Sequence, residues 1–100
     1  MYLVTTLLTG YQRDFSVVTD WDAYGYVAAS QYREDIILHL SESNDIPSKI
    51  SKETEFQLSH VSNTLSDLVE KELVVCVNPE KNKGRVYSLT EKGEWVASQL

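Results

Sequence analysis

The sequence predicts a small α+β domain in which several helices precede a β-hairpin and one more helix follows it. The chain has 100 residues, of which 42% are hydrophobic, so it can bury one compact core. From about residue 20 to residue 73, apolar residues recur every three or four positions, which is typical of amphipathic helices. After Leu73, two runs rich in β-branched residues flank a turn-prone segment, which indicates paired strands.

The first twenty residues do not share the helical pattern of the rest. The runs "YLVTTLL" and "FSVVT" are rich in β-branched residues and are separated by "TGYQRD", which contains a turn-prone glycine. These runs favour two short strands or an irregular arm, and an amphipathic helix over residues 2–12 is the alternative. We therefore expect residues 1–20 to form an N-terminal extension and residues 21–100 to form the domain.

Two helices are expected between the extension and the first proline. The segment "DWDAYGYVAAS" begins with aspartates that suit helix capping, and Ser30 is a candidate cap for "QYREDIILHLSES". The apolar residues of this second helix share one face: Tyr32, Ile36, Ile37 and Leu40. Pro47 ends the pattern because it pushes Ile46 out of the α region. Pro47 or Ser48 then opens a short helix with Ile50 directed inward.

The next helix, expected over about residues 58–71, has one apolar and one polar face. The apolar stripe comprises Leu58, Val61, Leu65, Leu68 and Val69. The residues opposite that stripe are Ser59, Asn63, Ser66 and Glu70, with His60, Ser62 and Asp67 on its flanks. The polar face is either an ordinary solvated surface or a binding surface, because short hydroxyls and amides also suit phosphates and base edges.

The hairpin and the last helix complete the pattern. The runs "VVCVN" and "RVYSLT" are joined by "PEKNKG", and Thr90 is suited to cap "EKGEWVASQL", in which Trp95 and Val96 can pack inward. Two helices joined by a tight turn and followed by a hairpin form a winged helix-turn-helix. The sequence thus predicts a three-helix core with a β-hairpin wing, over about residues 78–86, and a C-terminal helix. In this fold the second helix of the pair can enter the major groove of DNA, and the wing can reach the neighbouring backbone or minor groove.

Residues 30–96 resemble the winged-helix domains of small archaeal and bacterial transcriptional regulators of the MarR/ArsR type. The resemblance is carried by four motifs: Pro47-Ser48-x-Ile50-Ser51, Leu58-Ser59-His60-Val61-Ser62, the Gly84-Arg85 wing and Tyr87-x-Leu89-Thr90-x-x-Gly93. It implies sequence-specific binding of double-stranded DNA by a recognition helix over about residues 58–71. With the pattern of polar and basic residues, it gives the following candidate DNA contacts: Lys49, Lys52, Ser59, His60, Ser62, Asn63, Ser66, Lys81, Lys83 and Arg85.

The sequence departs from the family pattern at four places. Glu55 stands where the turn before the recognition helix often has glycine, and Gln57 stands where a Ser or Thr cap is common. Asn63 replaces a common basic residue, and Lys71-Glu72 replaces the usual Lys-Gly after the helix. The alternative function is therefore a winged-helix protein-interaction module that does not bind DNA.

The charge is distributed unevenly along the chain. The formal net charge is -6, and residues 1–45 carry seven acidic but only two basic residues. The C-terminal part is nearly neutral, and three of its seven basic residues, Lys81, Lys83 and Arg85, cluster in the wing segment. This argues against general adhesion to nucleic acid but allows a locally positive face.

Composition also narrows the chemistry and the assembly. A single cysteine, Cys76, excludes an internal disulfide and fits the cytoplasm, and we expect neither a membrane span nor a signal peptide. His39, His60 and Cys76 lack zinc-like spacing, and no catalytic constellation is present, so we expect no metal, no cofactor and no enzyme activity. A homodimer is expected because such regulators usually read two half-sites. The N-terminal aromatics could form a ligand pocket, supply the dimer surface or simply pack in the core: Tyr2, Tyr11, Phe15, Trp21, Tyr24 and Tyr26.

Overall fold

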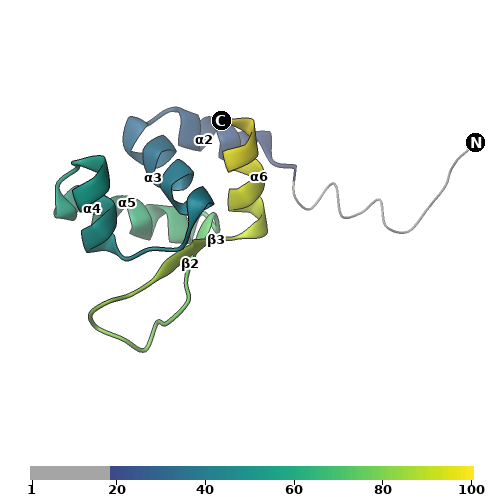
Figure 1. The fold of residues 1–100 in the computed structure, drawn as a ribbon. Coiled ribbons are helices and arrows are strands. Elements are labelled where there is room, and N and C mark those ends of the chain that lie inside the picture. The colour runs from purple at the N-terminus through teal and green to yellow at the C-terminus, as the bar shows by residue number, and fades with distance from the viewer. Residues whose placement is uncertain (1–18) are drawn as a thin grey trace, which may run out of the picture.

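The computed structural model describes residues 19–100, and the expectations for residues 1–18 lie outside this part of the chain. Its helices and strands follow the predicted order: α2 (Trp21–Ala28), α3 (Gln31–Glu42), α4 (Pro47–Thr54), α5 (Leu58–Glu70), β2 (Val74–Cys76), β3 (Tyr87–Leu89) and α6 (Glu91–Gln99). Figure 1 shows the helices grouped above a hairpin whose loop extends away from them. The prediction of an α+β winged helix-turn-helix is confirmed. Among residues 19–100, none of the helices has the length and hydropathy needed to cross a membrane.

The helix starts follow from local capping chemistry. The Asp20 side chain accepts a hydrogen bond from the Ala23 N–H (3.0 Å), Ser30 accepts one from Arg33 (3.4 Å), and Thr90 accepts one from Gly93 (3.0 Å). Each bond satisfies an N–H group that the first turn of a helix leaves without a partner. The predicted caps at Ser30 and Thr90 are therefore confirmed, as is an aspartate cap for the helix that begins at Trp21.

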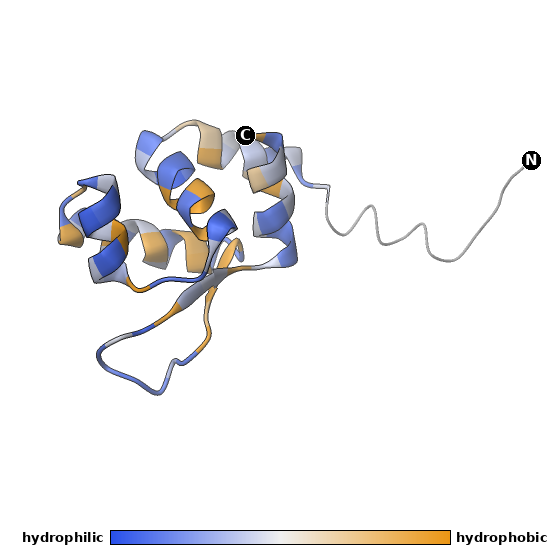
Figure 2. Cartoon of the chain, in the orientation of Figure 1, coloured by the Kyte–Doolittle hydropathy of each residue, from blue (hydrophilic) through white to orange (hydrophobic). Residues whose placement is uncertain are grey.

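The core lies where α3 crosses α5 and α6 and meets the hairpin. In Figure 2, hydrophobic and hydrophilic residues alternate along α3 and α5, as expected for helices with one buried face. The buried hydrophobic residues are Val27, Ile36, Ile37, Leu40, Ile50, Val61, Leu65, Leu68, Leu73, Val74, Leu89 and Val96. Every helix from α2 to α6 and both strands contribute to this cluster, so the described residues fold around one core.

Two members of the predicted stripe on α5 are not buried. Leu58 is 49% exposed and Val69 is 39% exposed, whereas Val61, Leu65 and Leu68 are buried. At 3.6 residues per turn, Leu58 and Val69 lie about 60° and 80° around the helix from Val61, on the same side. The buried part of the predicted stripe is therefore narrower than the stripe itself, and Leu58 and Val69 form its exposed edge.

Two residues adopt the left-handed backbone conformation that usually favours glycine. Glu55, at the end of α4, has φ of 65°, and Glu72, after α5, has φ of 63°. The resemblance to winged-helix regulators implied a glycine at both positions, and the backbone conformation agrees with it. A side chain with a Cβ atom is strained in this conformation, which makes both glutamates locally unfavourable.

The connection between α3 and α4 is joined to the base of the wing. The two strands pair in antiparallel register, with Val74 opposite Leu89 and Cys76 opposite Tyr87. Tyr87 also exchanges two backbone hydrogen bonds with Asp45, one of 3.2 Å and one of 2.8 Å. The start of α4 and the start of β3 are thereby held together, which fixes the helix-turn-helix relative to the wing.

Candidate nucleic-acid interface

A tight turn of residues 55–57 sets the direction of α5 relative to α4. The Ser51 hydroxyl donates to the Phe56 carbonyl (2.6 Å), and the Thr54 hydroxyl donates to the Ile50 carbonyl (2.7 Å). Gln57 stands at the N-cap of α5, but its side chain makes no capping hydrogen bond. The first N–H groups of α5 therefore lack a side-chain acceptor from the cap, which leaves them available to an external acceptor such as a phosphate.

The exposed face of α5 is polar and, over residues 58–66, has no Lys, Arg, Asp or Glu. Ser59, Ser62, Asn63 and Ser66 are all exposed, as predicted from their helical positions. Their side chains are short and offer both donors and acceptors. This surface can approach a polar partner closely without having to move long charged side chains aside.

His60 lies on the other flank of α5, beside α3. Its ring is 5.1 Å from the ring of Tyr32 in an edge-to-face arrangement, and Tyr32 lies 4.6 Å from Phe56 in the same way. Edge-to-face contacts at these distances are favourable. His60 is exposed but belongs to this aromatic cluster, so it is directed away from the flank on which Ser62 lies.

The wing is organised by side chains that bond to its own backbone. Asn78 accepts a hydrogen bond from the Val86 N–H (2.8 Å) and donates one to the Gly84 carbonyl (3.1 Å). Arg85 donates from Nε to the Lys81 carbonyl (2.6 Å) and from Nη2 to the Pro79 carbonyl (3.1 Å). Gly84 has φ of 69°, a conformation that glycine adopts without strain. The loop of the wing is thus a defined turn, and part of the Arg85 guanidinium is occupied in holding it.

A groove separates α5 from the wing. Its volume is about 490 Å³, and its lining includes Leu58, Ser62, Lys83 and Arg85 together with Pro47 and Tyr87. The structure thus brings a hydroxyl of α5 and two basic residues of the wing to one concave surface.

Comparison with known proteins agrees with this architecture. A family model described as winged helix-turn-helix matches residues 33–100. The chain belongs to the winged helix-turn-helix family. The resemblance to this family inferred from the sequence motifs is confirmed.

Several solved structures share the fold of this winged helix. ZitR from Lactococcus lactis in complex with DNA is 29% identical, with 67% of this chain and 47% of that chain covered and a TM-score of 0.60. A ZitR double mutant is 27% identical over 70% of this chain and 49% of that chain, with a TM-score of 0.63. MarR from E. coli, at 18% identity, covers 94% of this chain and 75% of that one, with a TM-score of 0.64, and shows the fold alone. This chain spans about half the length of ZitR. A search of curated proteins gave no match.

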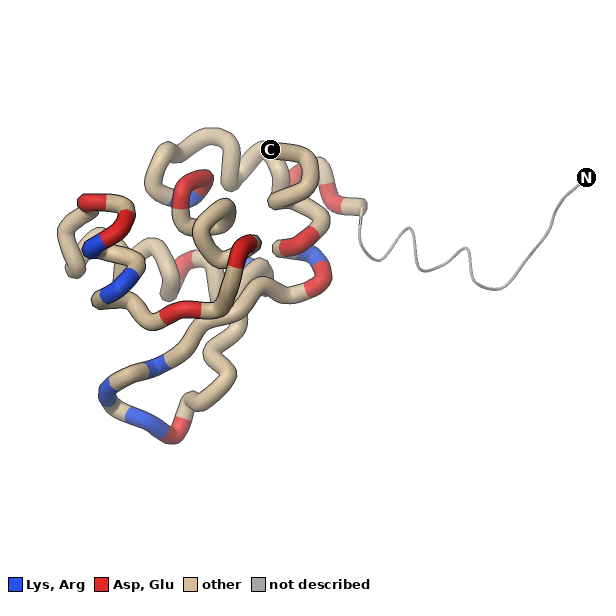
Figure 3. Tube along the Cα trace, in the orientation of Figure 1, with Lys and Arg blue, Asp and Glu red and all other residues tan. Residues whose placement is uncertain are grey.

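The basic residues among the candidate DNA contacts lie on two elements. Lys49 and Lys52 are exposed on α4, and the wing carries the basic residues Lys81, Lys83 and Arg85, as Figure 3 shows. Acidic residues stand close by in the chain, at Glu53 and Glu55 after the lysines of α4 and at Glu80 in the wing. Lys83 and Arg85 line the groove together with Leu58 and Ser62 of α5, whereas Lys49 and Lys52 do not line it.

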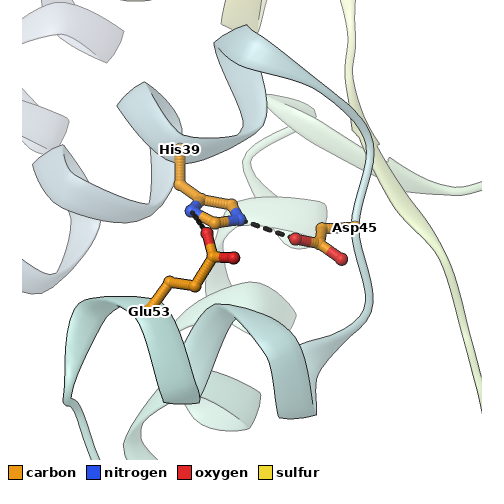
Figure 4. Close-up of side chains that lie close together, drawn as sticks. All are labelled: His39, Asp45 and Glu53. Carbon is orange, nitrogen blue, oxygen red and sulfur yellow. Dashed lines mark hydrogen bonds and ion pairs between the residues drawn. The ribbon is translucent and has the colours of Figure 1, made fainter.

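A second cluster of titratable residues, His39, Asp45 and Glu53, lies between α3 and α4 (Figure 4). His39 Nε2 is 2.8 Å from Asp45 Oδ2, and His39 Nδ1 is 3.7 Å from Glu53 Oε1. Although burial raises the pKa of Asp45, its hydrogen bonds with His39 and the Ile46 N–H, together with the charge of Lys49, hold that pKa below its usual value. These residues come from three separate elements, so no local sequence signal pointed to the cluster.

The geometry of this cluster suits a bridging imidazole better than a metal ion. The three residues are of ligand type, and their ligand atoms lie within 4.8 Å of one another. However, the two carboxylates face opposite nitrogens of the His39 ring, as Figure 4 shows. A metal ion binds only one of those nitrogens, so one ion could not meet both carboxylates and the ring without a rearrangement. As it stands, the ring joins the end of α3 to Asp45 and to α4.

Proposed function

We propose that this winged helix is a sequence-specific transcriptional regulator that binds double-stranded DNA. The observation that carries the proposal is the uncharged, short-chain polar face of α5 beside a groove whose other wall is the basic wing. Such a surface can enter a major groove while the wing lies on the neighbouring backbone. The likeness to ZitR, which was solved in complex with DNA, supports the proposal.

The proposed contacts fall into three groups. Ser59, Ser62, Asn63 and Ser66 would meet base edges and phosphates from α5. Lys49 and Lys52 would meet phosphates beside α4, and His60 would meet a phosphate from its position on the flank of α5. The wing would contribute Lys81, Lys83 and Arg85. This mechanism requires neither a metal ion nor a cofactor.

We also propose that the protein acts as a homodimer, with residues 21–100 as the DNA-binding domain and residues 1–20 as an extension to it. Trp21 is 59% exposed and lies 4.9 Å from Trp95 in an edge-to-face contact, which gives an aromatic surface where the extension joins the domain. Exposed aromatic surface of this kind is common at protein interfaces. A dimer would also allow recognition of two half-sites.

A gel-shift screen of the full chain against genomic fragments at moderate salt tests DNA binding. We expect specific fragments to be retained, and we expect Lys83→Glu to weaken their binding. Lys92→Glu is the matched control, because it makes the same change in charge on α6, where Lys92 lies 3.6 Å from Asp20. Retention of no fragment would favour the alternative, a protein-interaction module, which the net charge of -6 would suit.

A further inference from the structure

Leu58 is an exposed aliphatic side chain at the start of the recognition helix. It is 49% exposed, whereas Val61, three residues later, is fully buried. Apart from the buried Val61 and Leu65, the other side chains over residues 58–66 are polar. Leu58 therefore supplies the exposed apolar surface of the first two turns of α5.

The structure directs Leu58 toward the surface that we propose to meet DNA. It lies on the same flank of α5 as Ser62, and both residues line the groove beside Gly84 and Arg85 of the wing. A partner that follows this groove and contacts Ser62 would also cover Leu58.

The start of α5 does not require a leucine at this position. Leu58 is the first residue of the helix, where proline or a polar residue would serve the backbone equally well. Leu58 is 49% exposed and is not a member of the buried core, to which α5 contributes Val61, Leu65 and Leu68. A leucine here leaves apolar surface in water that binding could remove.

The major groove of DNA offers one apolar feature, the 5-methyl group of thymine. The other groups on the base edges are hydrogen-bond donors or acceptors, which a leucine cannot satisfy. Placing Leu58 against the amino group of cytosine would bury a donor without a partner, which is unfavourable.

We propose that Leu58 is a specificity-determining residue that selects a thymine through its 5-methyl group. The proposal rests on the proposed DNA-binding function and adds one element of the recognised sequence. The neighbouring Ser59, Ser62 and Asn63 would read polar base edges, so the preferred site would combine a thymine methyl contact with polar contacts next to it.

The test begins with selection of duplex DNA from a randomised pool by the full chain. Each thymine of the selected site is then replaced in turn by deoxyuridine, which removes only the methyl group. At one position of each half-site we expect the affinity of the wild type to fall by about 3- to 5-fold, the factor expected when one methyl contact is lost. With Leu58→Ala, the same replacement should have no effect.

Two control variants keep the test specific. Val69→Ala removes a comparably exposed side chain from the last turn of α5 and should leave the sensitivity to deoxyuridine intact. Leu58→Met keeps an apolar side chain, so this variant should also keep the sensitivity to deoxyuridine. Thermal unfolding of each variant checks that the domain is still folded.

The possible failures are distinguishable. If the wild type enriches no DNA sequence, the DNA-binding function fails and this proposal fails with it. If a sequence is enriched but every deoxyuridine replacement is neutral, or affects wild type and Leu58→Ala equally, the methyl contact is refuted while DNA binding stands.

Discussion

At the scale of single residues, two glutamates are held in a conformation that suits glycine. Glu72 has φ of 63° after the end of α5, and its carbonyl accepts a hydrogen bond from the Thr90 hydroxyl (2.7 Å). That bond involves the backbone, so it does not depend on the side chain at position 72. The local strain of Glu72 can therefore be relieved without disturbing the connection to α6.

We expect Glu72→Gly to raise the free energy of unfolding by about 1 kcal/mol, because glycine adopts the left-handed conformation without the Cβ clash. Urea denaturation measures the change. Glu70→Gly is the matched control: Glu70 is exposed and is the last residue of α5, with a helical backbone, so glycine there should not raise the stability. Equal effects of the two substitutions would contradict this account.

Asp45 is a buried carboxylate whose protonation should weaken the fold. Its pKa is lower in the folded protein than in the unfolded chain, despite the opposing effect of burial, because of its hydrogen bonds with His39 and Ile46 and the charge of Lys49. A lowered pKa stabilises the fold above the unfolded value of 3.8. That stabilisation is lost as the pH falls through the folded pKa.

We therefore expect wild-type protein to lose more stability than Asp45→Asn as the pH is lowered from about 5 to about 3. An asparagine does not ionise, so its contribution stays constant over this range. Urea denaturation at several pH values measures both proteins. Parallel stability curves for the two would show that Asp45 does not contribute to the acid sensitivity.

At the scale of secondary-structure elements, Gly93 allows α6 to pack closely against Leu73, in the segment between α5 and β2. A Cβ atom at position 93 would overlap the Leu73 carbonyl oxygen, and that oxygen accepts a hydrogen bond from the Thr90 N–H (3.1 Å). Close packing against the Leu73 carbonyl therefore explains why the Tyr87-x-Leu89-Thr90-x-x-Gly93 motif ends in glycine.

Gly93→Ala should lower the free energy of unfolding by about 1–3 kcal/mol, because α6 must move away from Leu73. Gly25→Ala is the matched control. A Cβ at Gly25, within α2, would have no neighbour within 4 Å, so alanine there should raise the stability by up to about 1 kcal/mol through its higher helix propensity. Thermal unfolding measures both variants. We expect their midpoint temperatures to shift in opposite directions from that of the wild type.

The hydrogen bonds of Arg85 suggest two separable contributions from the wing. Its charge would attract phosphates, while its bonds to the Lys81 and Pro79 carbonyls order the loop. Arg85→Ala should weaken DNA binding. It should also reduce, by about one, the steepness with which the logarithm of the binding constant falls with the logarithm of the salt concentration. Arg85→Lys keeps the charge, so it should preserve the salt dependence but bind more weakly, because lysine cannot hold both carbonyls in the same way.

Fluorescence anisotropy with labelled DNA over a series of salt concentrations measures both quantities. An affinity and a salt dependence that are unchanged in Arg85→Ala would remove Arg85 from the interface. If Arg85→Lys matched the wild type in both respects, the ordering of the loop by the guanidinium would have no part in binding.

The elements of this domain were predictable because their signals are local. Ser30 and Thr90 cap helices through contacts three residues away, and the apolar spacing of α5 follows from the turn of a single helix. The exposure of Leu58 was missed because periodicity gives the direction of a side chain but not how far neighbouring elements extend over it. The bonds of Arg85 within the wing were missed for a similar reason, since they depend on the path of a loop.

At the scale of the whole molecule, contacts between distant segments were beyond the sequence pattern. His39 was first considered with His60 and Cys76, but the fold places it between Asp45 and Glu53. That grouping depends on how α3, the following loop and α4 meet in space, and Asp45 in turn is tied to Tyr87 of the wing. The fold class could be predicted from patterns along the chain, whereas this network required the arrangement of the elements.

The balance of charge over the whole molecule bears on the proposed dimer. The chain carries a net charge of -6, so repulsion from DNA opposes the local attraction of the wing and α4. One copy should therefore bind a single half-site weakly. Two linked copies would combine their contacts, because binding of the first copy raises the effective concentration of the second.

We expect the full chain to be a dimer by light scattering and to bind a two-half-site duplex at least about tenfold more tightly than a single half-site. Trp21→Glu should weaken the dimer, because it would place a charge beside Trp95 on the exposed aromatic surface. The same variant should then bind the two duplexes with similar affinity. Trp21→Tyr keeps an aromatic ring and serves as the control. A wild-type protein that stays monomeric at high concentration, yet binds the two-half-site duplex tightly, would contradict this account of its assembly.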